Sequence, residues 1–222
     1  MRRRLSRRRL YLMRHAEVAY FGADGAPVDP ESVPLTEAGR AQAEAARRAL
    51  EGVRLDRVVA SSLPRTQETA RIVAPESEPE VWPDFDEWRG GRLRDLPEHE
   101  LERHFVGALR VDDESARFLG GESLGELLDR VLPALDRLLA ADWDTLLAVL
   151  HGGVNRVILS HALTGGRLYL NGFEQAPACV NVLDVGDDGW IVRTVNYVPY
   201  DPLHPARSTT MEQLWEAFRG AG

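Results

Sequence analysis

Three short apolar runs of this chain each end at side chains that could bind an anion. The first leads into Arg14 and His15, another into His151, and a third into serines followed by Arg65. In open α/β sheets, ligands bind beyond the carboxyl ends of the strands. If these runs are neighbouring strands, two imidazoles and two guanidinium groups meet in one pocket. Because arginine forks bind oxyanions strongly, that pocket suits a phosphoryl group.

The residue types also indicate a division of labour at such a site. A neutral imidazole can attack phosphorus when its other ring nitrogen is held as a donor, and His15 is the candidate nucleophile. Arg14 and Arg65 would bind the transferring oxygens from two sides, and His151 would add a further donor. Phosphoryl transfer depends mainly on positioning and electrostatic stabilisation, which these residues would provide.

The elements that must position these residues alternate between strands and helices. Apolar runs and turn residues predict strands near residues 10–13, 56–60, 81 and 146–150, and a hairpin over 180–185 and 190–195. Apolar periodicity and caps predict helices over residues 38–50, 65–73, 124–139 and 157–163. The fold class predicted is α/β, a three-layer sandwich with a mostly parallel central sheet, helices on both faces and a small cap insertion.

The domain organisation expected is simple. Residues 10–222 are predicted to form a single domain, with residues 85–121 as a cap or insertion over the sheet. Residues 1–9 contain six arginines and are expected to be a disordered tail. A basic arm for nucleic acid or acidic lipid is the alternative for this tail, but the block runs directly into the first strand. The net charge of -8 argues against a general nucleic-acid surface.

Composition excludes several other kinds of chemistry. All 27 basic side chains are arginines, which rules out a Schiff-base lysine and a P-loop lysine. Cys179 is the single cysteine, so no internal disulfide can form, and a reducing, cytoplasmic location is expected. No apolar run approaches the roughly 20 residues that a membrane span needs, so no membrane partner is expected.

Six short motifs occur in an order that is typical of one enzyme family. They are Leu12-Met13-Arg14-His15-Ala16-Glu17, residues 35–43, residues 61–70, Asp86-Glu87-Trp88-Arg89-Gly90-Gly91, residues 120–123 and His151-Gly152-Gly153. With these motifs the chain resembles the histidine phosphatase superfamily, in its phosphoglycerate mutase-like branch. It departs from the family at Ala16, where glycine is usual, and at residues 18–20, where many relatives carry a phosphate-contacting asparagine.

The resemblance implies a mechanism with two phosphoryl transfers and no metal or organic cofactor. His15 would take the phosphoryl group while Glu87 protonates the leaving oxygen, and Glu87 would then deprotonate the water that attacks phosphohistidine. His151 completes the catalytic residues. The predicted phosphate-binding residues are Arg14, Arg65, Ser62 and Gly152, although Ser62 could equally serve to form the turn.

Several alternatives stay open at this point. A phosphomutase is the second reading, but the chain lacks the basic, tyrosine-rich insert that phosphoglycerate mutases use, which favours hydrolysis. A catalytically weak module that binds phosphorylated ligands is the third reading. Asp84 or Asp86 could replace Glu87 as the acid. The expected partner is a small phosphorylated substrate of unknown identity, and the oligomeric state is open, with a homodimer as one candidate.

Overall fold

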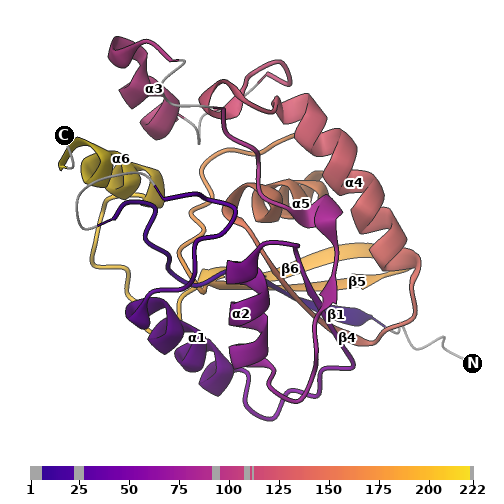
Figure 1. Cartoon of the computed structure of the whole chain (residues 1–222). Helices are drawn as coiled ribbons and strands as arrows, with labels where there is room; N and C mark the ends of the chain where they lie inside the picture. The colour runs from indigo at the N-terminus through magenta and orange to yellow at the C-terminus, as the bar shows by residue number, and fades with distance from the viewer. Residues whose placement is uncertain (1–6, 23–27, 92–95, 108–110, 112, 221–222) are drawn as a thin grey trace, which may run out of the picture.

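The chain folds around a single sheet of mixed but mostly parallel strands (Figure 1). The computed structural model describes residues 7–22, 28–91, 96–107, 111 and 113–220. Within these residues the strands are β1 (Arg8–Arg14), β2 (Arg57–Ala60), β3 (Glu80–Val81), β4 (Thr145–Leu150), β5 (Val180–Gly186) and β6 (Gly189–Tyr197). Their order is β3-β2-β4-β1-β5-β6. The first four of that order are mutually parallel, and β5 and β6 form the predicted antiparallel hairpin.

Helices connect these strands and begin where capping residues stand. The described residues form α1 (Glu37–Ala49), α2 (Pro64–Val73), α3 (Leu101–Val106), α4 (Leu124–Ala140), α5 (Gly152–Thr164) and α6 (Thr210–Gly220), with 3₁₀ turns at Pro83–Phe85, Glu98–Glu100 and Phe118–Gly120. Thr36 caps α1 through its hydroxyl, and Ser123 and Glu126 form a reciprocal capping box on α4. Such caps satisfy the backbone donors that the first helical turn leaves free.

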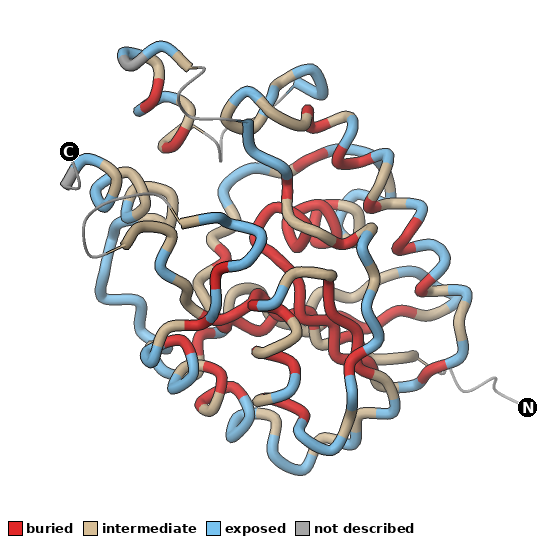
Figure 2. Tube along the Cα trace, viewed as in Figure 1, coloured by how far each residue is buried: buried red, intermediate tan, exposed pale blue. Residues whose placement is uncertain are grey.

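The alternation of β4 divides the core into two halves. Leu146, Ala148 and Leu150 face a cluster built largely by α4 and α5, whereas Leu147 and Val149 face one built largely by α1 and α2. This follows from the period of two in a strand, which sends successive side chains to opposite faces. Buried residues are accordingly concentrated along the sheet and on the helix sides turned towards it (Figure 2). The predicted three-layer α/β sandwich is confirmed.

Strand order determines where the functional side chains gather. β4 pairs in parallel with β1 on one side and with β2 on the other. The carboxyl ends of these three strands therefore lie next to one another at the same edge of the sheet. They lead into His15, Ser61 and His151, the residues that directly follow β1, β2 and β4.

The structure differs from the sequence prediction at the start of the chain. Residues 1–6 of the predicted tail lie outside the described residues, but Arg8 and Arg9 belong to β1. The Arg8 guanidinium lies 4.3 Å from the centre of the Trp143 ring, and Arg9 forms an ion pair with Asp184. These partners are far away in sequence, so the arginine-rich composition concealed the beginning of the strand.

Two further regions depart from expectation or go beyond it. Within the predicted cap, residues 92–95, 108–110 and 112 lie outside the described residues, and the boundaries 85–121 stay a prediction. The helix α6 was not predicted at all, although Thr209 and Glu212 form a capping box at its start. Among the described helices, none has the length and apolar character needed to cross a bilayer.

Candidate active site

The two histidines that follow β1 and β4 meet face to edge. Their ring centroids are 5.2 Å apart with an interplanar angle of 62°, and both side chains are buried. The backbone N–H of His15 donates to the carbonyl of Leu150 at 2.9 Å, which extends the β1–β4 pairing to the residue that bears the imidazole. The structure therefore brings together two side chains that are 136 positions apart in the sequence.

The hydrogen bonds of His15 assign its tautomer. Nδ1 lies 2.7 Å from the carbonyl oxygen of Ala16, and because that oxygen can only accept, Nδ1 carries the proton. Nε2 is buried and has no hydrogen-bond partner among the described residues. A neutral imidazole held in this way presents an unshared electron pair at Nε2, as a nucleophile at phosphorus requires.

His151 is held with the opposite polarity. Its Nε2 lies 2.7 Å from the hydroxyl of Ser61, which itself accepts a hydrogen bond from the backbone N–H of Leu63. The neighbouring Thr66 hydroxyl donates to the Leu63 carbonyl, so the Ser61 proton is free to point at Nε2. The proton of the ring then resides on Nδ1, which is buried and unpartnered within the described chain. His151 thus offers a donor where His15 offers an electron pair.

Arg14 and Arg65 stand beside this pair. Arg14 donates through one terminal nitrogen to the Gln175 carbonyl and to the Thr210 hydroxyl, and Arg65 donates to the Pro30 carbonyl. The Nε atoms of both arginines are buried without a partner among the described residues. Together with His15 Nε2 and His151 Nδ1, four buried nitrogen atoms of one site lack a protein acceptor or donor. Buried polar groups are normally hydrogen-bonded, so such a set points to an external oxyanion.

Burial and the two arginines keep both imidazoles neutral. For His15, burial is the largest cause that holds the pKa well below its usual value near 6.5, followed by the charges of Arg65 and Arg14. For His151, burial again comes first, followed by the charges of Arg65 and His15, and its pKa is likewise lowered. Desolvation and nearby positive charge both disfavour the protonated ring. At neutral pH the nucleophile is therefore in its reactive form.

These lowered pKa values predict a loss of stability in mild acid. The unfolded histidines bind protons below about pH 6.5, whereas the folded ones resist protonation, so the free energy of unfolding falls as the pH falls. Each histidine contributes a slope of at most about 1.4 kcal/mol per pH unit below that point. Urea unfolding in phosphate-free buffer between about pH 7 and pH 5 measures the effect. The double variant His15→Asn, His151→Asn should show a shallower slope, and an unchanged slope would contradict the assignment.

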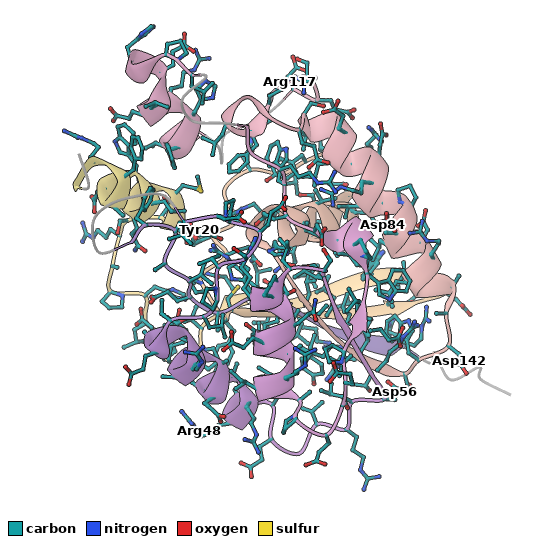
Figure 3. The ribbon with its side chains drawn as sticks, in the orientation of Figure 1. Tyr20, Arg48, Asp56, Asp84, Arg117 and Asp142 are labelled. Carbon is teal, nitrogen blue, oxygen red and sulfur yellow. The ribbon has the colours of Figure 1, made fainter. Side chains whose placement is uncertain are left out.

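Glu87 is the member of the predicted acidic segment that reaches the histidine pair. Its Oε1 accepts hydrogen bonds from the backbone N–H of Gly153 at 3.1 Å and from its neighbour Trp88 at 2.9 Å. Asp86 instead accepts the hydroxyl and backbone N–H of Ser62. Asp84, labelled beside α4 in Figure 3, is ion-paired with a residue of that helix. Of the three carboxylates that the sequence left open, Glu87 alone is bonded to the start of α5.

The position of Glu87 is fixed from α4. Arg130 donates to the backbone carbonyls of Asp84, Asp86 and Glu87, and its charge is balanced by Glu122 at 2.9 Å. Charge-assisted hydrogen bonds of this kind hold a loop more firmly than neutral ones. The segment that carries the carboxylate is therefore anchored by a buried guanidinium that does not itself touch the histidines in any contact described.

Two glycines allow the close approach of charged groups at the start of α5. A Cβ at Gly153 would lie 2.8 Å from Glu87 Oε1, and one at Gly152 would lie 3.2 Å from a terminal nitrogen of Arg156 and 3.7 Å from Arg14 Nε. A side chain at Gly153 would therefore displace the carboxylate. Gly152 lies against the Arg14 guanidinium, which agrees with its predicted location beside the phosphate.

Sequence reasoning placed some residues differently and missed others. The structure assigns the hydroxyl of Ser62 to Asp86, and it is Ser61 that contacts His151. Arg156 was not singled out, although it is buried and donates to the Phe173 carbonyl at 2.7 Å. Its position one turn after the second histidine was a readable signal. Thr210, which contacts Arg14, had none, because 196 positions separate the two residues.

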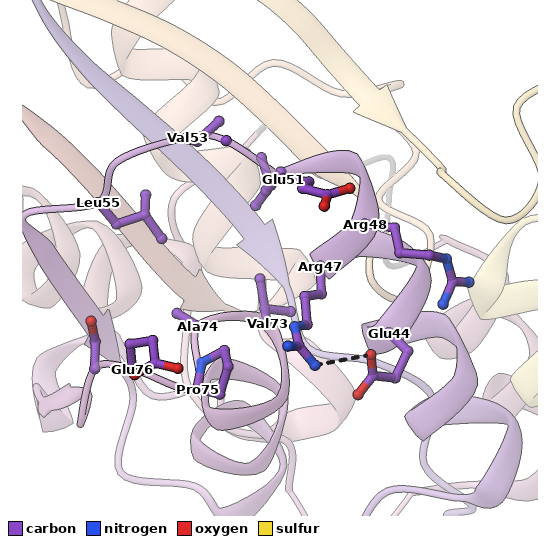
Figure 4. Close-up of a pocket in the computed structure, with 13 residues that line it drawn as sticks. Glu44, Arg47, Arg48, Glu51, Val53, Leu55, Val73, Ala74, Pro75 and Glu76 are labelled. Atoms are coloured by element: carbon purple, nitrogen blue, oxygen red, sulfur yellow. Dashed lines mark ion pairs between the residues drawn. The ribbon is translucent and has the colours of Figure 1, made fainter.

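The cavity at this site is not the largest in the molecule. Arg14 and His15 line a cavity of about 320 Å³. A cavity of about 630 Å³ lies at the carboxyl ends of α1 and α2, and Figure 4 shows its charged rim, where Arg47 and Glu44 form an ion pair at 3.5 Å. Neither histidine lines it. No three His, Cys, Asp or Glu side chains of the described residues are grouped as metal ligands.

Comparisons with known proteins agree with this geometry. A family model for the histidine phosphatase superfamily (branch 1) matches residues 10–198. The adenosylcobalamin/alpha-ribazole phosphatase of Salmonella typhimurium is 30% identical over 85% of this chain and 96% of its own length. A putative alpha-ribazole-5'-P phosphatase from Escherichia coli superposes with a TM-score of 0.64 at 27% identity, covering 85% and 96% of the two chains. A mycobacterial glucosyl-3-phosphoglycerate phosphatase with bound VO3 has the same TM-score at 26% identity, covering 85% and 98%. This chain belongs to the histidine phosphatase superfamily, branch 1.

Proposed function

We propose that this chain is a phosphatase that hydrolyses small phosphate monoesters through a phosphohistidine on His15. The observation that carries the proposal is the set of four buried, unpartnered nitrogen atoms around one pair of imidazoles. Arg14 and Arg65 supply guanidinium groups for the phosphoryl oxygens, and His151 supplies a ring N–H. The backbone of Gly152, at the N-terminus of α5, adds the positive end of a helix.

The first transfer forms a phosphorus–nitrogen bond. Nε2 of His15 attacks phosphorus in line with the leaving oxygen, and the bond from phosphorus to that oxygen breaks. Glu87 donates its proton to the leaving oxygen, so that a neutral alcohol departs. The charge that spreads over the three equatorial oxygens is met by the arginines and by His151.

The second transfer returns the site to its starting state. Glu87, now a carboxylate, takes a proton from water as the water oxygen attacks the phosphorus of phosphohistidine. The phosphorus–nitrogen bond breaks, inorganic phosphate is released, and His15 recovers its neutral form. No step uses a metal or an organic cofactor. Ser62 has no part in this scheme, because its hydroxyl is bonded to Asp86.

Hydrolysis is favoured over phosphoryl transfer to a second hydroxyl. The relatives reported above that align with most of this chain carry phosphatase names. A mutase remains the alternative, and it would return the phosphoryl group to the bound alcohol instead of to water. We place the reaction in the cytoplasm, which the buried free thiol of Cys179 supports.

The variant Glu87→Gln tests the proposed acid. For an alkyl phosphate such as glycerol phosphate, kcat/KM should fall by roughly 10² to 10⁴, because the departing alkoxide needs a proton. For p-nitrophenyl phosphate the fall should be much smaller, because its leaving group departs without one. Both substrates are assayed with a chelator present, and the wild-type rates should be unaffected by it.

The matched control is Asp84→Asn, which removes a neighbouring carboxylate that is bonded to Arg137. It should leave both rates near those of the wild type. An equal loss on the two substrates with Glu87→Gln would contradict the role of general acid. Loss of wild-type activity on chelation would contradict the metal-free mechanism.

A further inference from the structure

The helix α6 forms one wall of the cavity that contains Arg14 and His15. Thr210, Gln213, Leu214 and Ala217 line the cavity from this helix. The family model ends at residue 198, so the helix lies outside the part of the chain that the family shares. A wall contributed from outside the shared region is a candidate for selecting the substrate.

The helix is held in place by contacts at both of its ends. Near its start, the Thr210 hydroxyl accepts from Arg14 and donates to Glu174 at 2.6 Å. Near its end, the Phe218 ring packs against Phe21 and against Phe105 of α3, with centroids 5.9 and 5.7 Å apart. Figure 1 shows α6, in yellow, next to α3 on the same side of the molecule. These contacts make α6 a fixed wall.

The chemistry of the remaining lining is apolar and carries no further cation. Beyond the phosphoryl site, Val18, Tyr20, Phe21 and Leu214 present apolar surface. Tyr20, labelled in Figure 3, also lies with its ring centre 6.0 Å from the Arg65 guanidinium, which connects this surface to the phosphoryl site. Glu17 is the only additional charged side chain among the described residues that line the cavity.

We propose, on the basis of the proposed function, that this cavity binds the leaving alcohol and that α6 selects uncharged alcohols with an apolar or aromatic part. The apolar side chains bury such a group favourably. An alcohol that bears a carboxylate or a second phosphate would place a negative charge beside Glu17 without a cation to balance it. A buried charge without a partner is costly, so the site discriminates against these esters.

A matched pair of substrates tests the selection. Phenyl phosphate and 4-carboxyphenyl phosphate differ in one carboxylate, and kcat/KM should favour phenyl phosphate by about 10-fold or more. The variant Ala217→Arg places a cation on the exposed cavity side of α6 and should shift that ratio by about 10-fold towards the carboxylate. Gln213→Arg, one turn earlier on the same wall, should shift it in the same direction.

Glu216→Arg is the control, because residue 216 is exposed on the same helix and does not line the cavity. It changes the net charge more than Ala217→Arg does and should leave the ratio as in the wild type. Equal kcat/KM values for the two substrates, or a ratio that neither arginine variant shifts, would overturn the inference. Absence of any hydrolysis by the wild type, on these substrates and on p-nitrophenyl phosphate, would overturn the proposed function itself.

Discussion

His15→Ala is expected to lower the turnover of p-nitrophenyl phosphate by at least about 10⁴-fold. The variant removes the one atom, Nε2, that is buried, unpartnered and free to form a bond to phosphorus. The remaining site can still bind the substrate, but it must then rely on direct attack by water. The rate of p-nitrophenol release measures the loss, and rapid acid-free quenching with ³²P-labelled substrate measures the phosphohistidine.

His161→Ala is the matched control for this variant. His161 also lies on α5, is half-buried, and places its Nδ1 3.0 Å from the Gly166 carbonyl, away from the paired rings. It should retain both turnover and the label. If the label persisted in His15→Ala, the nucleophile would have to be a different residue, and the distinction drawn here between the tautomers of His15 and His151 would be wrong.

Arg65→Ala is expected to reduce kcat/KM by roughly 10³-fold, since it removes a guanidinium from the transferring oxygens. Arg65→Lys should recover little, because a single ammonium cannot reproduce a planar fork. The same change should raise the pKa of both histidines, because Arg65 is the largest charge that depresses each of them. A pH–rate profile should then show its acidic limb displaced to higher pH.

Arg71→Ala provides the comparison for Arg65 on the same helix. Arg71 is exposed and ion-paired with Glu78, so its loss should leave kcat/KM unchanged. A large loss of activity in Arg65→Ala with no shift of the acidic limb would show that Arg65 serves the phosphate but not the titration of the imidazoles. An activity close to that of the wild type would remove Arg65 from the site altogether.

The sequence was most informative where short-range signals coincide with strand ends. The apolar runs before His15 and His151 identify two strands, and the rule for parallel sheets then places both imidazoles at one edge. It was less informative within the turn after β2, where Ser61 and Ser62 are adjacent. Which hydroxyl points to His151 depends on the backbone path of that turn, and neighbouring residues leave it in different directions.

Long-range packing accounts for what could not be predicted. The helix α6 carries a readable capping box and apolar residues at 211, 214, 215 and 218, but its partners are Phe21 and Phe105, far away in the sequence. Ala16 posed the opposite question, since a glycine is usual there. It is not among the described non-glycine residues with positive φ, so its methyl group is accommodated in ordinary backbone conformation.

The backbone hydrogen bond from His15 to Leu150 has an evolutionary consequence. The imidazoles hang from adjacent rungs of one ladder, so their separation depends on the fixed spacing of paired strands and not on any loop. Segments such as α6 and the residues around Tyr20 can then drift, lengthen or be exchanged while the reacting atoms keep their arrangement. Lineages that inherit this sheet can acquire new substrates without having to reinvent the chemistry.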